Sequence, residues 1–298
     1  MKSINQYTYT PAFGSYYKSS FSKQLEHTLR TQDGADKVIQ EFNQVLRNKK
    51  NISSKLGQGN YGEVFRIDDY YVFKSYFNQE PRTDTFKSFT DNPFKDLKTY
   101  FGKVIAKIGN IEIIRNVTKN AKNFIQMANS KKEGVQAFDQ ALREFASLPQ
   151  QAFDNLAEDF DKLNKIRKGC SFFRFDTHNP NNFIKVGKAI RIVDDIIWEP
   201  CEKPNTFYHL LRIFAQEGGD SGLKKELFKK CALACEKYQL PLDTDYKYLK
   251  SYVEELFRNA SIKTTFEQYY QKMTELRTAQ IDNNTRINLV EQYLNTII

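Results

Sequence analysis

The sequence predicts an α+β fold of two lobes, a small β-rich lobe followed by a larger helical one. Residues 56–74 combine three glycines with short β-branched and aromatic runs, which is typical of a hairpin of strands. From residue 134 onward, apolar residues recur mostly at helical spacing. We expect an N-terminal extension with helices at 1–50, the small lobe at 51–130 and the large lobe at 131–298.

The composition is that of a globular protein. The chain has 298 residues, of which 40% are hydrophobic and 27% are charged. It contains no apolar run near the roughly 20 residues that cross a bilayer, and its N-terminus does not resemble a signal peptide. Its four cysteines form no disulfide framework and no C-x-x-C pair, which indicates a reducing compartment. We therefore expect a cytoplasmic protein that does not contact membranes.

The formal charge of +9 favours acidic partners, such as nucleic acid, phosphorylated protein or an acidic surface. The lysines occur in short pairs, such as Lys49-Lys50 and Lys131-Lys132, and form no long basic arm. A nucleic-acid or other acidic partner is therefore one interpretation of the charge, and a solvated basic surface is the other.

The glycine-rich stretch ends in a strand that carries Lys74. Three glycines are spaced G-x-G-x-x-G and a valine follows: Gly57, Gly59, Gly62 and Val64. A dinucleotide site with this spacing needs a helix at the third glycine and an acid about 20 residues on. Strand-forming residues follow instead, so the glycines would let backbone N–H groups approach phosphates, with the lysine nearby. A plain surface hairpin is the alternative.

Two more polar motifs follow in the second half of the chain. Residues 172–183 read FFRFDTHNPNNF, in which Asn181 stands five residues after Asp176. Asp194 ends the apolar run that begins at Ile190. Carboxylate and amide oxygens of this kind suit Mg²⁺ bound to phosphates. An Asn- and Asp-rich turn without chemistry is the alternative.

Taken in order, the three motifs resemble those of a divergent eukaryotic-like serine/threonine protein kinase. The departures from the usual pattern are similar to those of the kinases of large cytoplasmic DNA viruses, such as African swine fever virus. The resemblance implies a bilobal protein-kinase-like fold, ATP and Mg²⁺ as cofactors, and protein substrates. For the viral group it also implies host cytoplasm and virion.

The resemblance also implies a role for each site residue. The glycines and Val64 would bind ATP, and Lys74 would hold its α and β phosphates. Asp176 would be the base that takes the proton of the acceptor hydroxyl. Asn181 and Asp194 would hold Mg²⁺, with Asp195 as the alternative to Asp194.

In protein kinases a helix after the lysine strand supplies a glutamate that holds the lysine. We expect this helix at 91–107, near Pro93. No glutamate occurs between Glu80 and Glu112, so Asp96 is the helical candidate and Glu80 the alternative from a loop. A solvated helix residue without this role is the plain alternative for Asp96.

Two strands, expected at 111–118 and 123–127, would be the fourth and fifth of the small lobe. Met127 would then close the adenine pocket, although a plain core role is equally consistent. Helices are expected at 134–168 with a break at Pro149, and near 206–217, 222–238, 245–258, 264–280 and 286–297.

Two other functions stay open. His178 stands where protein kinases carry lysine and aminoglycoside-type kinases carry histidine, and it would contact the γ-phosphate or brace the loop. With the short segment after Ile196, it favours a small-molecule kinase of the aminoglycoside or choline type. The missing helix glutamate favours a nucleotide-binding pseudokinase that acts as an interaction module.

Overall fold

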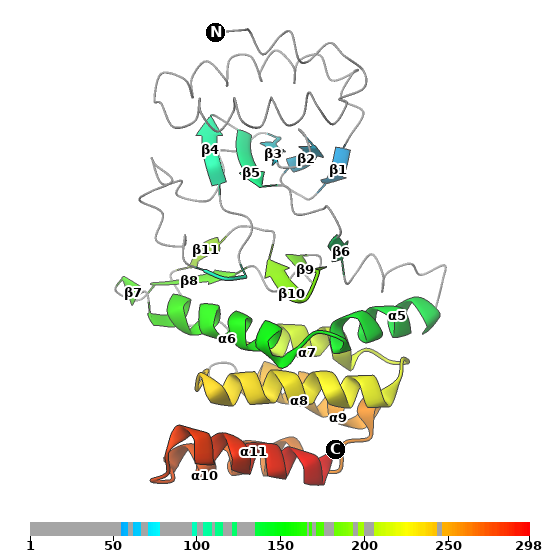
Figure 1. Ribbon diagram of the computed structural model, residues 1–298, viewed down its shortest axis with the longest axis vertical. Helices are drawn as coiled ribbons and strands as arrows, with labels where there is room; N and C mark the ends of the chain where they lie inside the picture. Colours follow the sequence, from blue (N-terminus) through cyan, green and yellow to red (C-terminus); the bar gives the residue numbers. More distant parts are fainter. Residues whose placement is uncertain are drawn as a thin grey trace, which may run out of the picture. The chain divides into compact units, whose positions relative to one another are not determined.

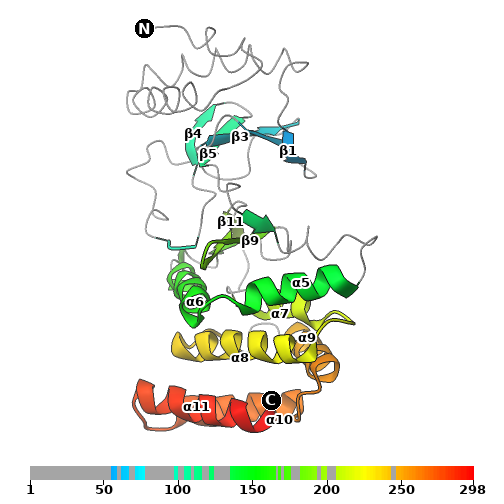
Figure 2. The same ribbon diagram turned by 45° about the vertical axis from the view of Figure 1, so that its right-hand side comes forward.

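The computed structural model shows a mixed α+β protein, as predicted (Figures 1 and 2). It describes residues 55–58, 62–66, 71–77, 97–99, 104–108, 111–115, 121–123, 135–165, 167–168, 171–175, 182–192, 196–199, 206–242 and 246–298. The chain divides into two compact units. The first comprises Met1–Asp96 and Phe101–Lys119, and the second comprises Leu97–Tyr100 and Asn120–Ile298.

The first unit contains a five-stranded antiparallel sheet in the order β1-β2-β3-β5-β4. Its strands are β1 (Lys55–Gln58), β2 (Gly62–Arg66), β3 (Tyr71–Tyr76), β4 (Val104–Ile108) and β5 (Ile111–Arg115). Val72 and Phe73 are both buried, and successive strand residues face opposite sides, so both faces of β3 are covered. Phe73 also stacks on its cross-strand partner Phe65, with ring centroids 5.0 Å apart. The predicted glycine-rich hairpin is thus confirmed.

All helices in the described ranges belong to the second unit. They are α5 (Val135–Ala146), α6 (Gln150–Lys165), α7 (Tyr208–Ala215), α8 (Ser221–Lys237), α9 (Tyr246–Ala260), α10 (Phe266–Thr278) and α11 (Asn283–Ile297). In both ribbon views α8 lies between α5 and α6 on one side and α10 and α11 on the other (Figures 1 and 2). The expected break at Pro149 separates α5 from α6. None of the helices in the described part of the chain is long and apolar enough to cross a membrane.

Six short strands in the same unit form two antiparallel sheets, in the orders β10-β9-β6 and β11-β8-β7. They are β6 (Ala121–Asn123), β7 (Arg167–Lys168), β8 (Ser171–Phe175), β9 (Phe183–Val186), β10 (Ala189–Ile192) and β11 (Ile196–Glu199). Gly187, with φ of +59°, lies in the tight turn between β9 and β10, where the left-handed conformation favours glycine. These sheets flank the polar motifs of the sequence.

Several expected boundaries are wrong. The helix expected at 91–107 is absent from its described part, because Leu97–Thr99 is not helical and Val104–Ile108 is strand β4. The β-branched residues of β4 pair with β5, and this tertiary pairing overrides the helical spacing of the apolar residues. The fourth and fifth strands of the first sheet are therefore β4 and β5.

Two further boundaries shift in the second unit. Its strand β6 ends at Asn123 and pairs with β9, so it does not complete the first sheet as expected. The helix expected to reach residue 168 ends at Lys165, because Arg167–Lys168 pairs with β8. The other predicted helices are confirmed within a few residues of their expected ends.

Candidate functional site

The glycine-rich hairpin brings its strands unusually close. Gly57 pairs with Val64, and Gly62 pairs with Tyr76 on β3. A Cβ atom at Gly62 would overlap the carbonyl oxygen of Ser75 and lie 3.0 Å from its carbonyl carbon. Glycine at position 62 is therefore required by the backbone of the sheet itself, in addition to any part it has in binding a ligand.

Lys74 lies in the middle of this sheet. It is the cross-strand partner of Val64 on β2 and of Glu112 on β5. Directly opposed residues share a face, so the side chains of Val64 and Lys74 lie next to each other on one side of the hairpin. Lys74 is half-buried, and its Nζ lies 4.9 Å from the centre of the Tyr76 ring. The structure thus pairs β2, which begins at the third glycine of the pattern, with β3, the strand that carries Lys74.

The other predicted site residues lie outside the described residues, so the structure does not test their positions. They are Gly59, Asp96, Met127, Asp176, His178, Asn181 and Asp194, together with the alternatives Glu80 and Asp195. In the described ranges there is no group of three or more His, Cys, Asp or Glu residues that could hold a metal ion. The predicted Mg²⁺ ligands are not among those residues.

Described strands nevertheless flank the three predicted polar residues. Strand β8 ends at Phe175, which pairs with Ile196 at the start of β11. Strand β9 begins at Phe183, which pairs with Ile192 at the end of β10. The chain positions of Asp176, Asn181 and Asp194 therefore fall in the short connections between two paired strand ends.

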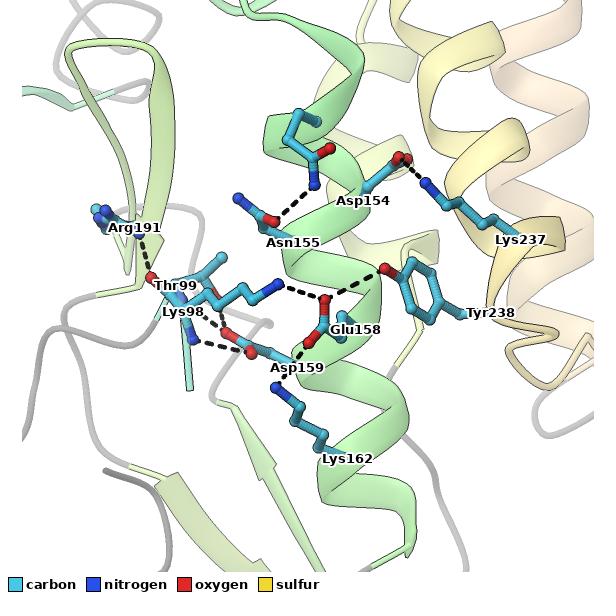
Figure 3. A network of polar contacts seen from close by, with 11 residues as sticks. Lys98, Thr99, Asp154, Asn155, Glu158, Asp159, Lys162, Arg191, Lys237 and Tyr238 are labelled. Atoms are coloured by element: carbon cyan, nitrogen blue, oxygen red, sulfur yellow. Dashed lines mark hydrogen bonds and ion pairs between the residues drawn. The ribbon is translucent and has the colours of Figure 1, made fainter. Parts of the chain in front are cut away.

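Helix α6 carries a buried carboxylate that sequence reasoning missed (Figure 3). Asp159 is fully buried, and its Oδ1 accepts a hydrogen bond from Lys98 N at 2.9 Å. Its Oδ2 accepts hydrogen bonds from Thr99 N and Thr99 Oγ1, both at 2.6 Å. Burial raises the pKa of the Asp159 carboxyl, and the hydrogen bonds from Thr99 and Lys98 oppose that rise.

The residue before it forms the exposed side of the same network. Glu158 binds the ammonium groups of Lys98 at 2.7 Å and Lys162 at 2.8 Å, and accepts a hydrogen bond from Tyr238 at 3.3 Å. Hydrogen bonds from Lys162 and Lys98 lower the pKa of Glu158 to about 2. Burial and the neighbouring Glu158 raise the pKa of Tyr238 to about 12. Two adjacent carboxyl groups therefore have pKa values shifted in opposite directions.

A signal for Asp159 was present in the sequence. Leu156, Asp159, Phe160 and Leu163 follow the i, i+3, i+4, i+7 spacing of one helix face, and all four are buried. A carboxylate on an apolar face indicates a buried polar partner, because an unpaired buried charge is costly. The partner, Leu97–Thr99, could not be found, because that stretch was expected to belong to a helix.

No family model matches the chain, and no curated protein matches its sequence. Among solved structures, the chain is similar to an ADP-bound aminoglycoside phosphotransferase, with 15% sequence identity. The match covers 86% of this chain and 97% of that chain, with a TM-score of 0.33. A similarity of this size assigns neither a family nor an activity to the chain.

Proposed function

We propose that the protein is an ATP- and Mg²⁺-dependent phosphotransferase with a bilobal, protein-kinase-like fold, the small lobe at 51–130 and the large lobe at 131–298. Its substrates would be serine and threonine hydroxyls of proteins. The observation that carries the proposal is the register of the first sheet, in which the glycine-rich hairpin pairs with the strand of Lys74.

The pairing of β2 with β3 suits the binding of a nucleoside triphosphate. Glycines before a paired strand leave room for phosphate oxygens to approach backbone N–H groups. The ammonium of Lys74 stands on the same face as Val64, which follows the third glycine by two residues. A cation beside such a turn can neutralise phosphate charge, while an apolar side chain such as valine suits the base or ribose. A surface hairpin would not require these groups in this order.

Covalent geometry supports the proposal that Asp176, Asn181 and Asp194 lie near one another. Ile192 and Ile196 each lie two residues from Asp194, and an extended chain spans at most about 3.6 Å per residue. The pairs Phe183–Ile192 and Phe175–Ile196 are therefore joined by a link of at most about 14 Å. Asp176 directly follows one pair, and Asn181 precedes the other by two residues.

The chemistry then follows from the residue types. Bound ATP would supply the γ-phosphoryl group, and bound Mg²⁺ would neutralise charge on its oxygens. Asp194 and Asn181 offer the carboxylate and amide oxygens that Mg²⁺ prefers. Asp176 would orient the acceptor hydroxyl and take its proton, a contribution of roughly 100- to 10,000-fold. Lys74 would orient the phosphates.

One observation favours a small-molecule kinase as the second candidate. Strand β11 ends at Glu199 and helix α7 already begins at Tyr208, so the connection after the predicted metal site is short. In protein kinases the corresponding segment forms the surface on which a peptide docks. A short connection leaves less of that surface, which suits a small alcohol substrate. The basic net charge of +9 counts against a cationic one.

The direct test is a phosphotransfer assay with Mg²⁺ and ATP on wild type, Asp176→Asn and Asp194→Asn. Mixed basic and acidic proteins, and separately a panel of small alcohols and aminoglycosides, would serve as acceptors. We expect transfer to protein serine or threonine, and a loss of at least about 100-fold in each variant. Transfer to small alcohols alone would favour the second candidate.

Two other outcomes would reject the enzyme. ATP binding without turnover on either acceptor set would indicate a pseudokinase that acts as an interaction module. Background transfer that stays equal in wild type and in both variants would exclude catalysis at this site altogether. Lys98→Ala is a suitable control for the effect of surface charge, because its side chain is 46% exposed.

A further inference from the structure

The segment Leu97–Thr99 belongs to the second unit, although the residues before and after it in the chain, through Asp96 and from Phe101, belong to the first. Leu97 and Thr99 are almost completely buried, at 6% and 1% exposed. The segment forms no helix and no strand. Its place must therefore be fixed by specific contacts, because it has no regular hydrogen-bond ladder of its own.

One side of the segment is held by α6. The Asp159 carboxylate accepts the two consecutive amide groups of Lys98 and Thr99 and also the Thr99 hydroxyl. A buried carboxylate is costly unless its oxygens are hydrogen-bonded, and three donors supply that compensation. Two adjacent amides bound to one buried carboxylate fix both the position and the orientation of the backbone.

The other side of the segment is held by β10. Thr99 O accepts a hydrogen bond from Ile192 N at 2.8 Å, and Arg191 donates from its guanidinium to Lys98 O. Figure 3 shows Arg191 and Asp159 on opposite sides of Lys98 and Thr99. The contacts therefore form a chain from α6, through Leu97–Thr99, to the last residue of β10. Ile192 itself is fully buried.

We propose that Asp159 is a positioning residue that fixes the end of β10 through Thr99. This inference rests on the proposed function, in which Asp194 holds Mg²⁺ two residues after Ile192. A carboxylate ligand must be held accurately for a metal with strict geometry. Asp159 would thus act on the metal site without touching the metal, the nucleotide or the substrate.

A structural role alone predicts a different result. If Asp159 only stabilised packing, its substitution would lower stability without changing how much Mg²⁺ the folded enzyme needs. Asp159→Asn is nearly isosteric, but an amide group replaces one oxygen with a donor, so the donors of Lys98 and Thr99 cannot all be accepted. Thr99→Val removes only the hydroxyl donor, and Thr99→Ser retains it.

The experiment measures the Mg²⁺ concentration for half-maximal phosphotransfer at saturating ATP, in wild type, Asp159→Asn, Thr99→Val, Thr99→Ser and Lys98→Ala. Substitutions that disturb a metal ligand's supporting contacts commonly cost 10- to 100-fold. We expect an increase of about tenfold for Asp159→Asn, a smaller increase for Thr99→Val, and wild-type values for Thr99→Ser. Lys98→Ala should also match wild type, because it keeps the backbone amide that Asp159 binds.

Native-state hydrogen exchange at the Ile192 amide gives a second readout that does not depend on activity. We expect this amide to exchange about tenfold faster in Asp159→Asn and to be unchanged in Lys98→Ala. If Asp159→Asn fails to fold, Thr99→Val carries both measurements. A normal Mg²⁺ requirement in a folded, active Asp159→Asn variant would overturn the proposal.

The two proposals fail in distinguishable ways. If wild type transfers no phosphate, the proposed function fails, and exchange at Ile192 alone decides whether Asp159 positions β10. Faster exchange in Asp159→Asn would then support the positioning role, and unchanged exchange would reject it. If wild type is active but Ile192 exchanges normally in Asp159→Asn, only the positioning role is lost.

Discussion

Among the described residues, the two units differ in how their paired charged side chains are buried. In the first, the pair of Lys55 and Glu63 joins the neighbouring strands β1 and β2, with the lysine side chain 41% exposed. In the second, Asp159 and Glu236 are completely buried and bound by several donors. Exposed pairs contribute little to stability, whereas breaking a buried pair is costly. Of these pairs, we therefore expect the buried ones of the second unit to matter most for folding.

Arg277→Met should test this contrast with the largest effect. Its Nε and one terminal nitrogen donate to the two oxygens of Glu236, both at 2.7 Å. Removal of the guanidinium leaves Glu236 buried without its ionic partner, so the free energy of unfolding should fall by about 3–5 kcal/mol in urea denaturation. Lys250→Ala is the matched control, because Lys250 pairs with Glu267 at the surface. It should change stability by less than about 1 kcal/mol.

If Arg277→Met and Lys250→Ala lowered the free energy of unfolding equally, buried and exposed pairs in the second unit would contribute alike to stability. The contrast between the two units would also be contradicted if Lys55→Ala, in the first unit, lowered the free energy of unfolding as much as Arg277→Met. Either result would mean that burial does not determine how much an ion pair contributes to the stability of this protein.

Gly62→Ala, in the first unit, should cause the next largest loss of stability. A methyl group at this position would overlap the carbonyl of Ser75, so β2 and β3 must separate locally. Overpacking of this kind costs about 1–3 kcal/mol, and nucleotide binding should weaken with it. Gly187→Ala is the control, because a Cβ there meets nothing within 4 Å and only its φ of +59° is unfavourable. It should cost about 1 kcal/mol and leave nucleotide binding unchanged.

A Gly62→Ala variant with wild-type stability would show that the sheet accommodates the extra carbon, which would remove the structural requirement for glycine. Thermal unfolding and titration with a fluorescent ATP analogue would measure the two effects on the same samples.

Glu158→Gln should have the smallest effect, and it should depend on pH. Lys162 and Lys98 lower the pKa of Glu158 to about 2, from an ordinary value of 4.5. The ionised form is therefore favoured in the folded state, and its stabilisation is present above about pH 4.5 and is lost as the pH falls toward 2. Because both lysines are solvent-exposed, we expect only about 0.5–1 kcal/mol at pH 7.

Urea denaturation of wild type and Glu158→Gln between pH 2 and pH 7 would measure this difference. The two proteins should converge at the acid end of the range. A constant difference across the range would show that Glu158 contributes through packing and not through charge. Asp161→Asn, which removes the more exposed pair with Lys165, is the control on the same helix.

The sequence predicted the regular parts of the fold well. Leu156, Phe160 and Leu163 lie on one face of α6, and the strand residues around Lys74 pair as expected. These predictions succeeded because local periodicity alone determines which face is buried. The prediction from the glycine spacing succeeded for a similar reason, because only glycine fits where two backbone segments approach closely.

The segment after Lys74 could not be predicted in the same way. Its apolar residues have helical spacing, but Leu97 is buried in the second unit and Val104–Ile108 pairs with β5. These partners are distant in the sequence, so no local pattern indicates them. The interaction of Asp159 with Thr99 spans sixty positions of the chain and was missed for the same reason. Asp176, Asn181 and Asp194 stay predictions of the sequence.

A double-mutant cycle on Mg-ATP binding, with Lys74→Met and Asp194→Asn, tests the central claim most directly. The claim is the proposed function, in which Lys74 and Asp194 act on the same bound Mg-ATP. We predict measurable Mg-ATP binding by wild type and a coupling free energy of at least about 1 kcal/mol between the two substitutions. Effects that add within about 0.5 kcal/mol, or a wild type that binds no Mg-ATP, would contradict it.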